Sequence, residues 1–229
     1  MFKILSAGIF CALLVGSVAA QRQSRDVIEA YRVCRQFQTL LAEDLDFDRA
    51  FEATFTKDAA RRREIAIYEG DFGDLRLKKI DDATLLKAYK ARMQIVYLML
   101  PLASPDSNEE EARFFPPPIK AIFDRKPPET SDEFPAYAQQ LQQDATALRA
   151  HLNQLAAQST RVAQRVRQFK QDLLQMPKLP DSEMTASTGY SRGHVLEPDE
   201  KYYQIGEYSV IREGREMKII GIQFFTRLF

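Results

Sequence analysis

Cysteine is scarce in this chain of 229 residues, which contains two. Cys11 lies in an apolar N-terminal segment, so removal of that segment would leave Cys34 alone and exclude an intramolecular disulfide. A single cysteine also excludes a cysteine-based zinc site, an iron–sulfur cluster and covalent haem attachment. We expect Cys34 to act as a small buried apolar residue of a helix.

Histidine is equally scarce, and His151 and His194 are far apart in the sequence. Neither has the glutamate or histidine spacing of di-iron bundles or zinc metalloproteases, so we predict no metal site from these residues and no cofactor. An all-carboxylate calcium site stays open, although no EF-hand loop occurs. Walker A and dinucleotide-binding patterns are also missing. These absences favour a non-catalytic protein and leave enzyme activity as an alternative.

The chain has no excess charge of either sign, with 32 basic and 32 acidic residues. Such a balance argues against nucleic acid as the main partner. The N-terminal residues 1–20 combine Lys3, an apolar run and a Val18-Ala19-Ala20 cleavage pattern, which predicts a signal peptide and an exported protein, periplasmic or extracellular. The apolar run is too short for a comfortable membrane span, so we do not expect an integral membrane protein after cleavage.

The stretch from Asp132 to Met176 has no glycine and carries a heptad pattern of apolar residues. Its two rows are Phe134, Leu141, Leu148, Leu155, Val162, Phe169 and Met176, and Ala138, Ala145, Leu152, Ser159, Val166 and Leu173. A continuous helix here would be roughly 66 Å long, more than the width of a compact domain, about 40–45 Å. We therefore predict a helix that protrudes or kinks near Ser159. Small residues next to the heptad rows widen the apolar face of this helix, which suits packing against two neighbouring helices of the same chain. We therefore favour an intramolecular bundle, with self-association through this helix as the alternative.

The fold class that follows is mainly α, a helical bundle with a small C-terminal β-hairpin or three-stranded element. We predict a bundle domain over residues 21–176, a loop at 177–201 and a hairpin at 202–229 packed on the helices. The apolar run from Ile95 to Leu102 is expected in the middle of the bundle. The basic cluster Arg61–Arg63 is interpreted as a solvated face that pairs with nearby carboxylates, with an anion site as the alternative.

Two segments carry the candidate binding residues. A proline-rich strap at 104–131 contains Phe114 and Phe115, which either pin the strap to the bundle or meet a partner. The loop at 177–201 contains Tyr190, Arg192 and His194. Its Gly-x-Ser-x-Gly pattern lacks the flanking strand, helix and later histidine of a hydrolase, so we interpret it as a glycine-rich loop.

Together these features favour an exported, non-catalytic helical protein that binds or scaffolds another envelope protein. One alternative is a periplasmic holdase chaperone that uses the long helix to hold unfolded clients. The other is an enzyme or small-ligand binder with a site between the bundle and the hairpin, and the sequence does not choose a ligand for it.

Overall fold

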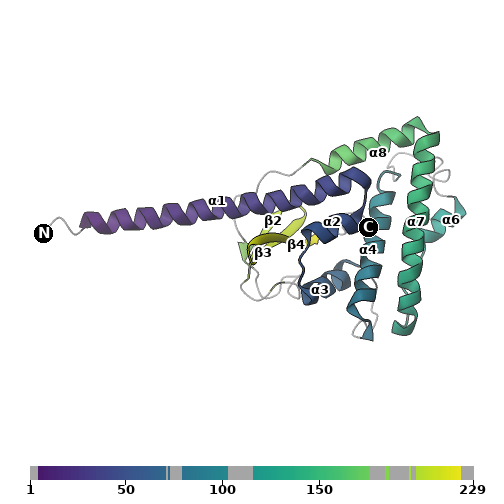
Figure 1. Cartoon of the computed structure of the whole chain (residues 1–229), viewed down its shortest axis with the longest axis horizontal. Coiled ribbons are helices and arrows are strands. Elements are labelled where there is room, and N and C mark those ends of the chain that lie inside the picture. Colours follow the sequence, from purple (N-terminus) through teal and green to yellow (C-terminus); the bar gives the residue numbers. More distant parts are fainter. Residues whose placement is uncertain are drawn as a thin grey trace.

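A computed structural model describes residues 5–70, 72, 79–102, 116–175, 184–185, 196 and 200–222. The chain is mainly helical, with a small antiparallel sheet near its C-terminus (Figure 1). The helices are α1 (Leu5–Asp44), α2 (Phe47–Thr54), α3 (Ala59–Glu69), α4 (Asp82–Met99), α6 (Pro117–Phe123), the 3₁₀ turn η2 (Ser131–Glu133), α7 (Phe134–Gln158) and α8 (Thr160–Leu173). The strands are β1 (Met184–Thr185), β2 (Lys201–Ile205), β3 (Tyr208–Glu213) and β4 (Glu216–Ile222). The predicted fold class is therefore confirmed.

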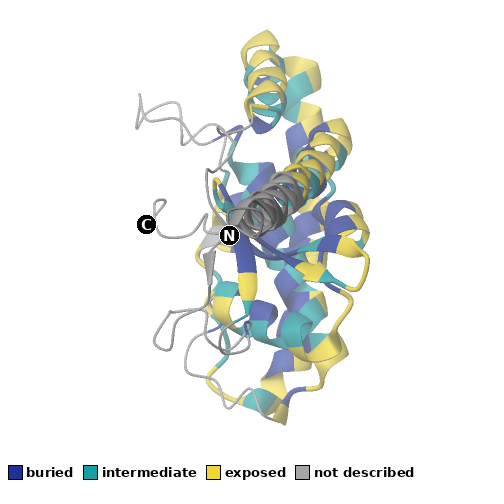
Figure 2. Ribbon diagram, turned by 90° about the vertical axis from the view of Figure 1, so that its left-hand side faces the viewer, coloured by how far each residue is buried: buried dark blue, intermediate teal, exposed yellow. Residues whose placement is uncertain are grey.

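Aromatic side chains of α1, α2 and α4 form the centre of the core. In α2, Phe47, Ala50, Phe51 and Thr54 recur at helical spacing and are all buried. The ring of Phe47 lies edge-on to that of Phe37 in α1 at 6.0 Å and stacks on that of Tyr97 in α4 at 5.7 Å. Figure 2, which looks along α1, shows buried residues on the inward sides of the helices. The Cys34 side chain is fully buried, and burial raises the pKa of its thiol.

Helix α7 packs along α4 through the heptad rows predicted from the sequence. Phe134, Leu141, Leu148 and Leu152 are all at most 3% exposed, so this part of the apolar seam is used within the chain. Ile95, Tyr97 and Leu98 of α4 are buried as well, as expected for a central helix. The long predicted helix does not continue through Ser159, where the backbone is extended at φ −131° and ψ 112°.

The break at Ser159 turns α8 away from α7 and back onto α1 (Figure 1). The Ser159 hydroxyl accepts a hydrogen bond from the Val162 amide at 3.4 Å and so caps the new helix. At the far end of α8, the Arg35 guanidinium of α1 donates to the Leu174 carbonyl. The predicted kink is therefore confirmed, and it lets one heptad pattern serve two neighbours.

The sheet has the order β1-β2-β3-β4 and is antiparallel throughout. Both connections within β2–β4 are two-residue turns that place a glycine in the left-handed region, Gly206 at φ 58° and Gly214 at φ 61°. One face rests on α1, where the Tyr208 ring meets that of Phe37 at 5.7 Å and the Tyr203 hydroxyl lies 3.2 Å from Asp26. The predicted hairpin and its third strand are confirmed.

The turn between α1 and α2 is held by side chains from three other helices. Leu45 has φ 54°, in the left-handed region, and its carbonyl accepts hydrogen bonds from Gln94 of α4 at 2.6 Å and Arg149 of α7 at 3.1 Å. Gln94 also accepts from the Phe47 amide at 2.9 Å, and Lys170 of α8 donates to the Glu43 carbonyl at 2.7 Å. These donors satisfy carbonyls that the last turn of α1 cannot satisfy itself.

Among the residues that the structure describes, no helix is both long and apolar enough to cross a bilayer.

Candidate functional site

The binding residues predicted from the sequence fall outside the described residues. Phe114 and Phe115 belong to the segment 103–115, and Tyr190, Arg192 and His194 belong to 186–195. They stay predictions. His151 lies on α7, half-buried, and the described part of the chain contains no group of three or more His, Cys, Asp or Glu side chains arranged to hold a metal ion.

The basic cluster on α3 pairs with carboxylates from three different places, as interpreted from the sequence, but its side chains are half-buried and do not form a solvated face. Arg61 makes two hydrogen bonds of 2.9 Å with Glu200, just before β2. Arg62 donates to Glu52 of α2 at 2.9 Å, and Arg63 donates to Asp82 at the start of α4. The cluster therefore ties α3 to its neighbours.

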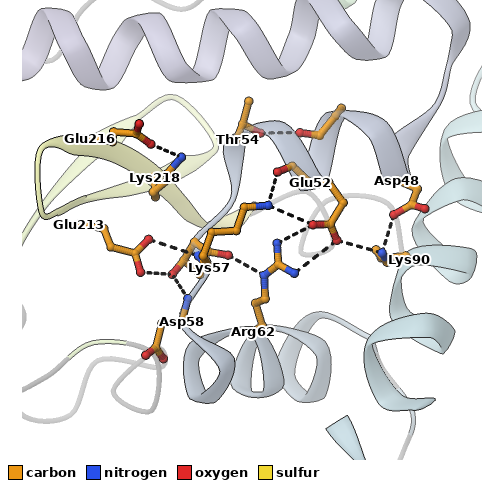
Figure 3. Close-up of polar contacts among 12 residues, drawn as sticks. Asp48, Glu52, Thr54, Lys57, Asp58, Arg62, Lys90, Glu213, Glu216 and Lys218 are labelled. Atoms are coloured by element: carbon orange, nitrogen blue, oxygen red, sulfur yellow. Dashed lines mark hydrogen bonds and ion pairs between the residues drawn. The ribbon is translucent and has the colours of Figure 1, made fainter. Parts of the chain in front are cut away.

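Glu52 is the centre of the densest charge network in the described structure (Figure 3). Its carboxylate receives Arg62 at 2.9 Å, Lys90 at 3.0 Å and Lys57 at 3.1 Å. Burial pushes the pKa of Glu52 upward, but the hydrogen bonds from Arg62, Lys90 and Lys57 outweigh it and lower the pKa to about 2. A carboxylate with so low a pKa stays ionised at neutral pH and is a poor general acid or base.

The same network anchors the hairpin to the helices. The Thr56 hydroxyl donates to Glu213 of β3 at 3.1 Å, and the Lys57 amide donates to the other oxygen of Glu213 at 3.2 Å (Figure 3). The Thr56 amide also donates to the Ile219 carbonyl of β4 at 3.0 Å. Because Glu213 begins the β3–β4 turn, these bonds fix the turn relative to α2.

A groove of about 490 Å³ lies beside this turn, between α1, α2 and the β3–β4 hairpin. We call it the α1–hairpin groove. It is lined by Glu29, Arg32, Val33 and Gln36 of α1, Ala53 of α2, Arg215 of the turn, and Glu216, Met217 and Lys218 of β4. The α1 residues recur at helical spacing, so they share one face of that helix.

Ion pairs hold the walls of the α1–hairpin groove in place. Arg212 of β3 binds Asp26 at 2.6 Å and Glu29 at 2.7 Å, which joins the hairpin to α1. The Arg212 hydrogen bond is the main cause that lowers the pKa of Glu29, and the Arg25 hydrogen bond adds to it. Lys218 pairs with Glu216 along β4 at 2.6 Å.

Two arginines of the groove are left over from this pairing. Arg32 and Arg215 are both exposed, and within the described part of the chain neither guanidinium has a hydrogen-bond or ion-pair partner. They supply positive charge and up to five N–H donors each at the rim of the groove. This arrangement can bind an anionic group, and its described residues do not form a nucleophile–base pair.

A larger hollow of about 650 Å³ lies along α8, lined by Arg161, Gln164, Arg165, Arg167, Gln168 and Gln171. All of these residues come from one helix, so the described residues make it a polar helix face. The α1–hairpin groove, whose walls come from three elements fixed by ion pairs, is the better candidate site.

The sequence could not have revealed this site. The pattern Glu29, Arg32, Gln36 reads as an ordinary solvated helix face, and Arg215 reads as an ordinary turn residue. Their proximity follows from contacts such as Arg212 to Asp26, which are 186 positions apart. No protein family, curated protein or solved structure matches the chain.

Proposed function

We propose that this chain is an exported, non-catalytic binding protein that holds another component of the cell envelope. The observation that carries the proposal is the α1–hairpin groove, which keeps at its rim two guanidiniums that have no partner among the described residues, while its other charged groups form ion pairs. Unpaired cations on rigid walls favour recognition of a partner. The signal-like residues 1–20 support export.

A small-ligand binder is the second candidate function, and the volume of the groove favours it. A groove of about 490 Å³ falls within the size range of small-molecule sites, about 300–1,000 Å³. The exposed side chains of Arg32, Gln36, Ala53 and Arg215 favour a macromolecular partner instead, because small-molecule sites bury most of the ligand surface.

The test is site-specific photo-cross-linking in the protein's own cell envelope. A photoreactive side chain placed at Gln36 lies in the groove, and one placed at Gln139, exposed on α7, provides the matched control. We expect one stoichiometric adduct from Gln36 and none from Gln139. Mass spectrometry of the exported protein should also find Gln21 as its first residue.

Three outcomes would overturn the proposal. Equal labelling from both positions by many unfolded proteins would indicate a chaperone. If folded protein gives no adduct from position 36, the groove does not bind a macromolecular partner. Substrate turnover that one point substitution abolishes would make the protein an enzyme.

A further inference from the structure

The charge balance around the α1–hairpin groove differs from that of the whole chain, which is neutral. Asp26 and Glu29 are matched by Arg25 and Arg212, and Glu216 is matched by Lys218. Among the lining residues and their ion-pair partners this leaves two positive charges, on Arg32 and Arg215, while the Glu213 carboxylate of the same turn is bound by the Thr56 hydroxyl and the Lys57 amide. A partner that fits this surface brings about two negative charges to it.

The groove also has an apolar component. The side chains of Val33 and Met217 are among its lining and are 8% and 6% exposed, and Ala53 adds a methyl group that is exposed. The complementary ligand thus combines carboxylates with an apolar side chain. Apolar contact at the centre and charged contact at the rim is the usual anatomy of a protein interface.

The position of the two arginines decides between a small anion and a chain segment. A phosphate-sized anion is held by convergent donors in an enclosed site, whereas Arg32 and Arg215 are both exposed and stand on different elements, α1 and the hairpin turn. Exposed ion pairs are weak one at a time, so binding here requires several contacts at once. An extended peptide can supply them.

We infer that the α1–hairpin groove binds an acidic segment of a partner protein, with at least two carboxylates flanking an apolar side chain. Arg32 and Arg215 bind the carboxylates, and the apolar side chain rests against the exposed Ala53 and the small exposed parts of Val33 and Met217. The inference rests on the proposed function and specifies the chemistry of its partner.

The test uses the mature protein and a fluorescein-labelled octapeptide of glutamates and aspartates interrupted by leucines, followed by fluorescence anisotropy. We expect saturable binding, and we expect Arg32→Ala and Arg215→Ala to raise Kd by about two- to fivefold each. The double variant Arg32→Glu with Arg215→Glu should raise Kd at least tenfold. Arg32→Lys with Arg215→Lys should keep most of the affinity.

The controls separate this site from general electrostatics. The double variant Lys120→Glu with Lys126→Glu makes the same change of four charge units as the double arginine variant, at exposed residues of α6 and the loop after it, away from the hairpin, and should leave Kd within twofold (Figure 1). A peptide with glutamine and asparagine in place of the acids should not bind. Because neither arginine holds a partner in the described structure, the variants should unfold at the wild-type temperature.

Several results would overturn the inference. If the wild-type protein does not bind the acidic peptide but position 36 still cross-links to a partner, the partner does not present an acidic segment here. The proposed function would then stand and the further inference would fail. Unchanged binding by the double glutamate variant would have the same meaning. Displacement of the peptide by equimolar inorganic phosphate would show a small-anion site. Failure of both cross-linking and peptide binding would refute the proposed function itself.

Discussion

Gln94 offers a sharp test of how the helices are joined. Its side chain accepts a hydrogen bond from the Phe47 amide at 2.9 Å and donates one to the Leu45 carbonyl at 2.6 Å. It therefore serves the first amide of α2 and the turn after α1 from a position on α4. We expect Gln94→Ala to destabilise the protein through loss of both bonds.

The two lost bonds do not cost the same. The Leu45 carbonyl keeps its bond from Arg149 at 3.1 Å, so the lost Gln94 bond costs about 1 kcal/mol or less there. Phe47 is fully buried, and its amide loses the Gln94 acceptor. Leaving this buried N–H without an acceptor costs about 1–3 kcal/mol. We expect a total of about 2–3 kcal/mol, which lowers Tm by roughly 4–12 °C for a chain of this size.

The assay is urea unfolding followed by far-UV circular dichroism, with Gln139→Ala as the matched control. Gln139 is exposed on α7, so the same substitution there changes helix propensity equally and removes no described hydrogen bond. The difference between the two variants isolates the role of Gln94. A difference below about 0.5 kcal/mol would refute the reasoning, because ordinary surface substitutions fall within that range.

Four other substitutions have definite expected results. The lowered pKa of Glu52, about 2 against an ordinary 4.5, means that its stabilisation is present above pH 4.5 and is lost as the pH falls toward 2. Because the Glu52 side chain is 40% exposed, Glu52→Gln should lower the unfolding free energy at neutral pH by only about 1 kcal/mol. Thermal unfolding should show this difference between the two proteins disappear as the pH falls from 4.5 toward 2. A difference that does not depend on pH would contradict the expectation. Gly70→Ala should destabilise by about 2–3 kcal/mol in urea, because the new Cβ would lie 2.3 Å from the Ala66 carbonyl oxygen. The Cβ of Gly214→Ala has no atom within 4 Å, so this variant should lose only about 1–2 kcal/mol of unfolding free energy, the cost of a side chain at a φ of +61°. A larger loss for Gly214→Ala than for Gly70→Ala would contradict this geometry. Ser159→Ala removes the cap on α8 and should cost about 1 kcal/mol, measured in the same way, and an unchanged urea midpoint would show that the cap contributes nothing.

Much of the fold was predictable because local patterns and the core agree. The heptad rows of α7 mark the face that α4 covers, and a serine followed by a β-branched residue marks the place where the helix breaks. The hairpin follows from runs of β-branched and aromatic residues on both sides of the turn at Gly214. In each case, the residues that decide the local structure are neighbours in the sequence.

The groove and the junction at Leu45 were not predictable for the opposite reason. Nothing near Gln94 in the sequence shows that its amide joins two helices, because its partners lie 47 and 49 positions away. The same holds for Arg32 and Arg215, which line one groove because Arg212 binds Glu29 of α1, 183 positions away. Sequence patterns report which residues are exposed, and tertiary contacts decide which exposed residues become neighbours.

Helix α1 is synthesised first, but many of its tertiary contacts come from segments that are synthesised last. Its side chains and carbonyls form hydrogen bonds with residues much later in the chain. These are Arg149, Lys170, Leu174 and Arg212, at separations of 105, 127, 139 and 186 positions. A chain interrupted before β3 would leave the apolar face around Phe37 without the Tyr208 ring that packs on it. Complete packing of α1 therefore requires nearly the whole polypeptide.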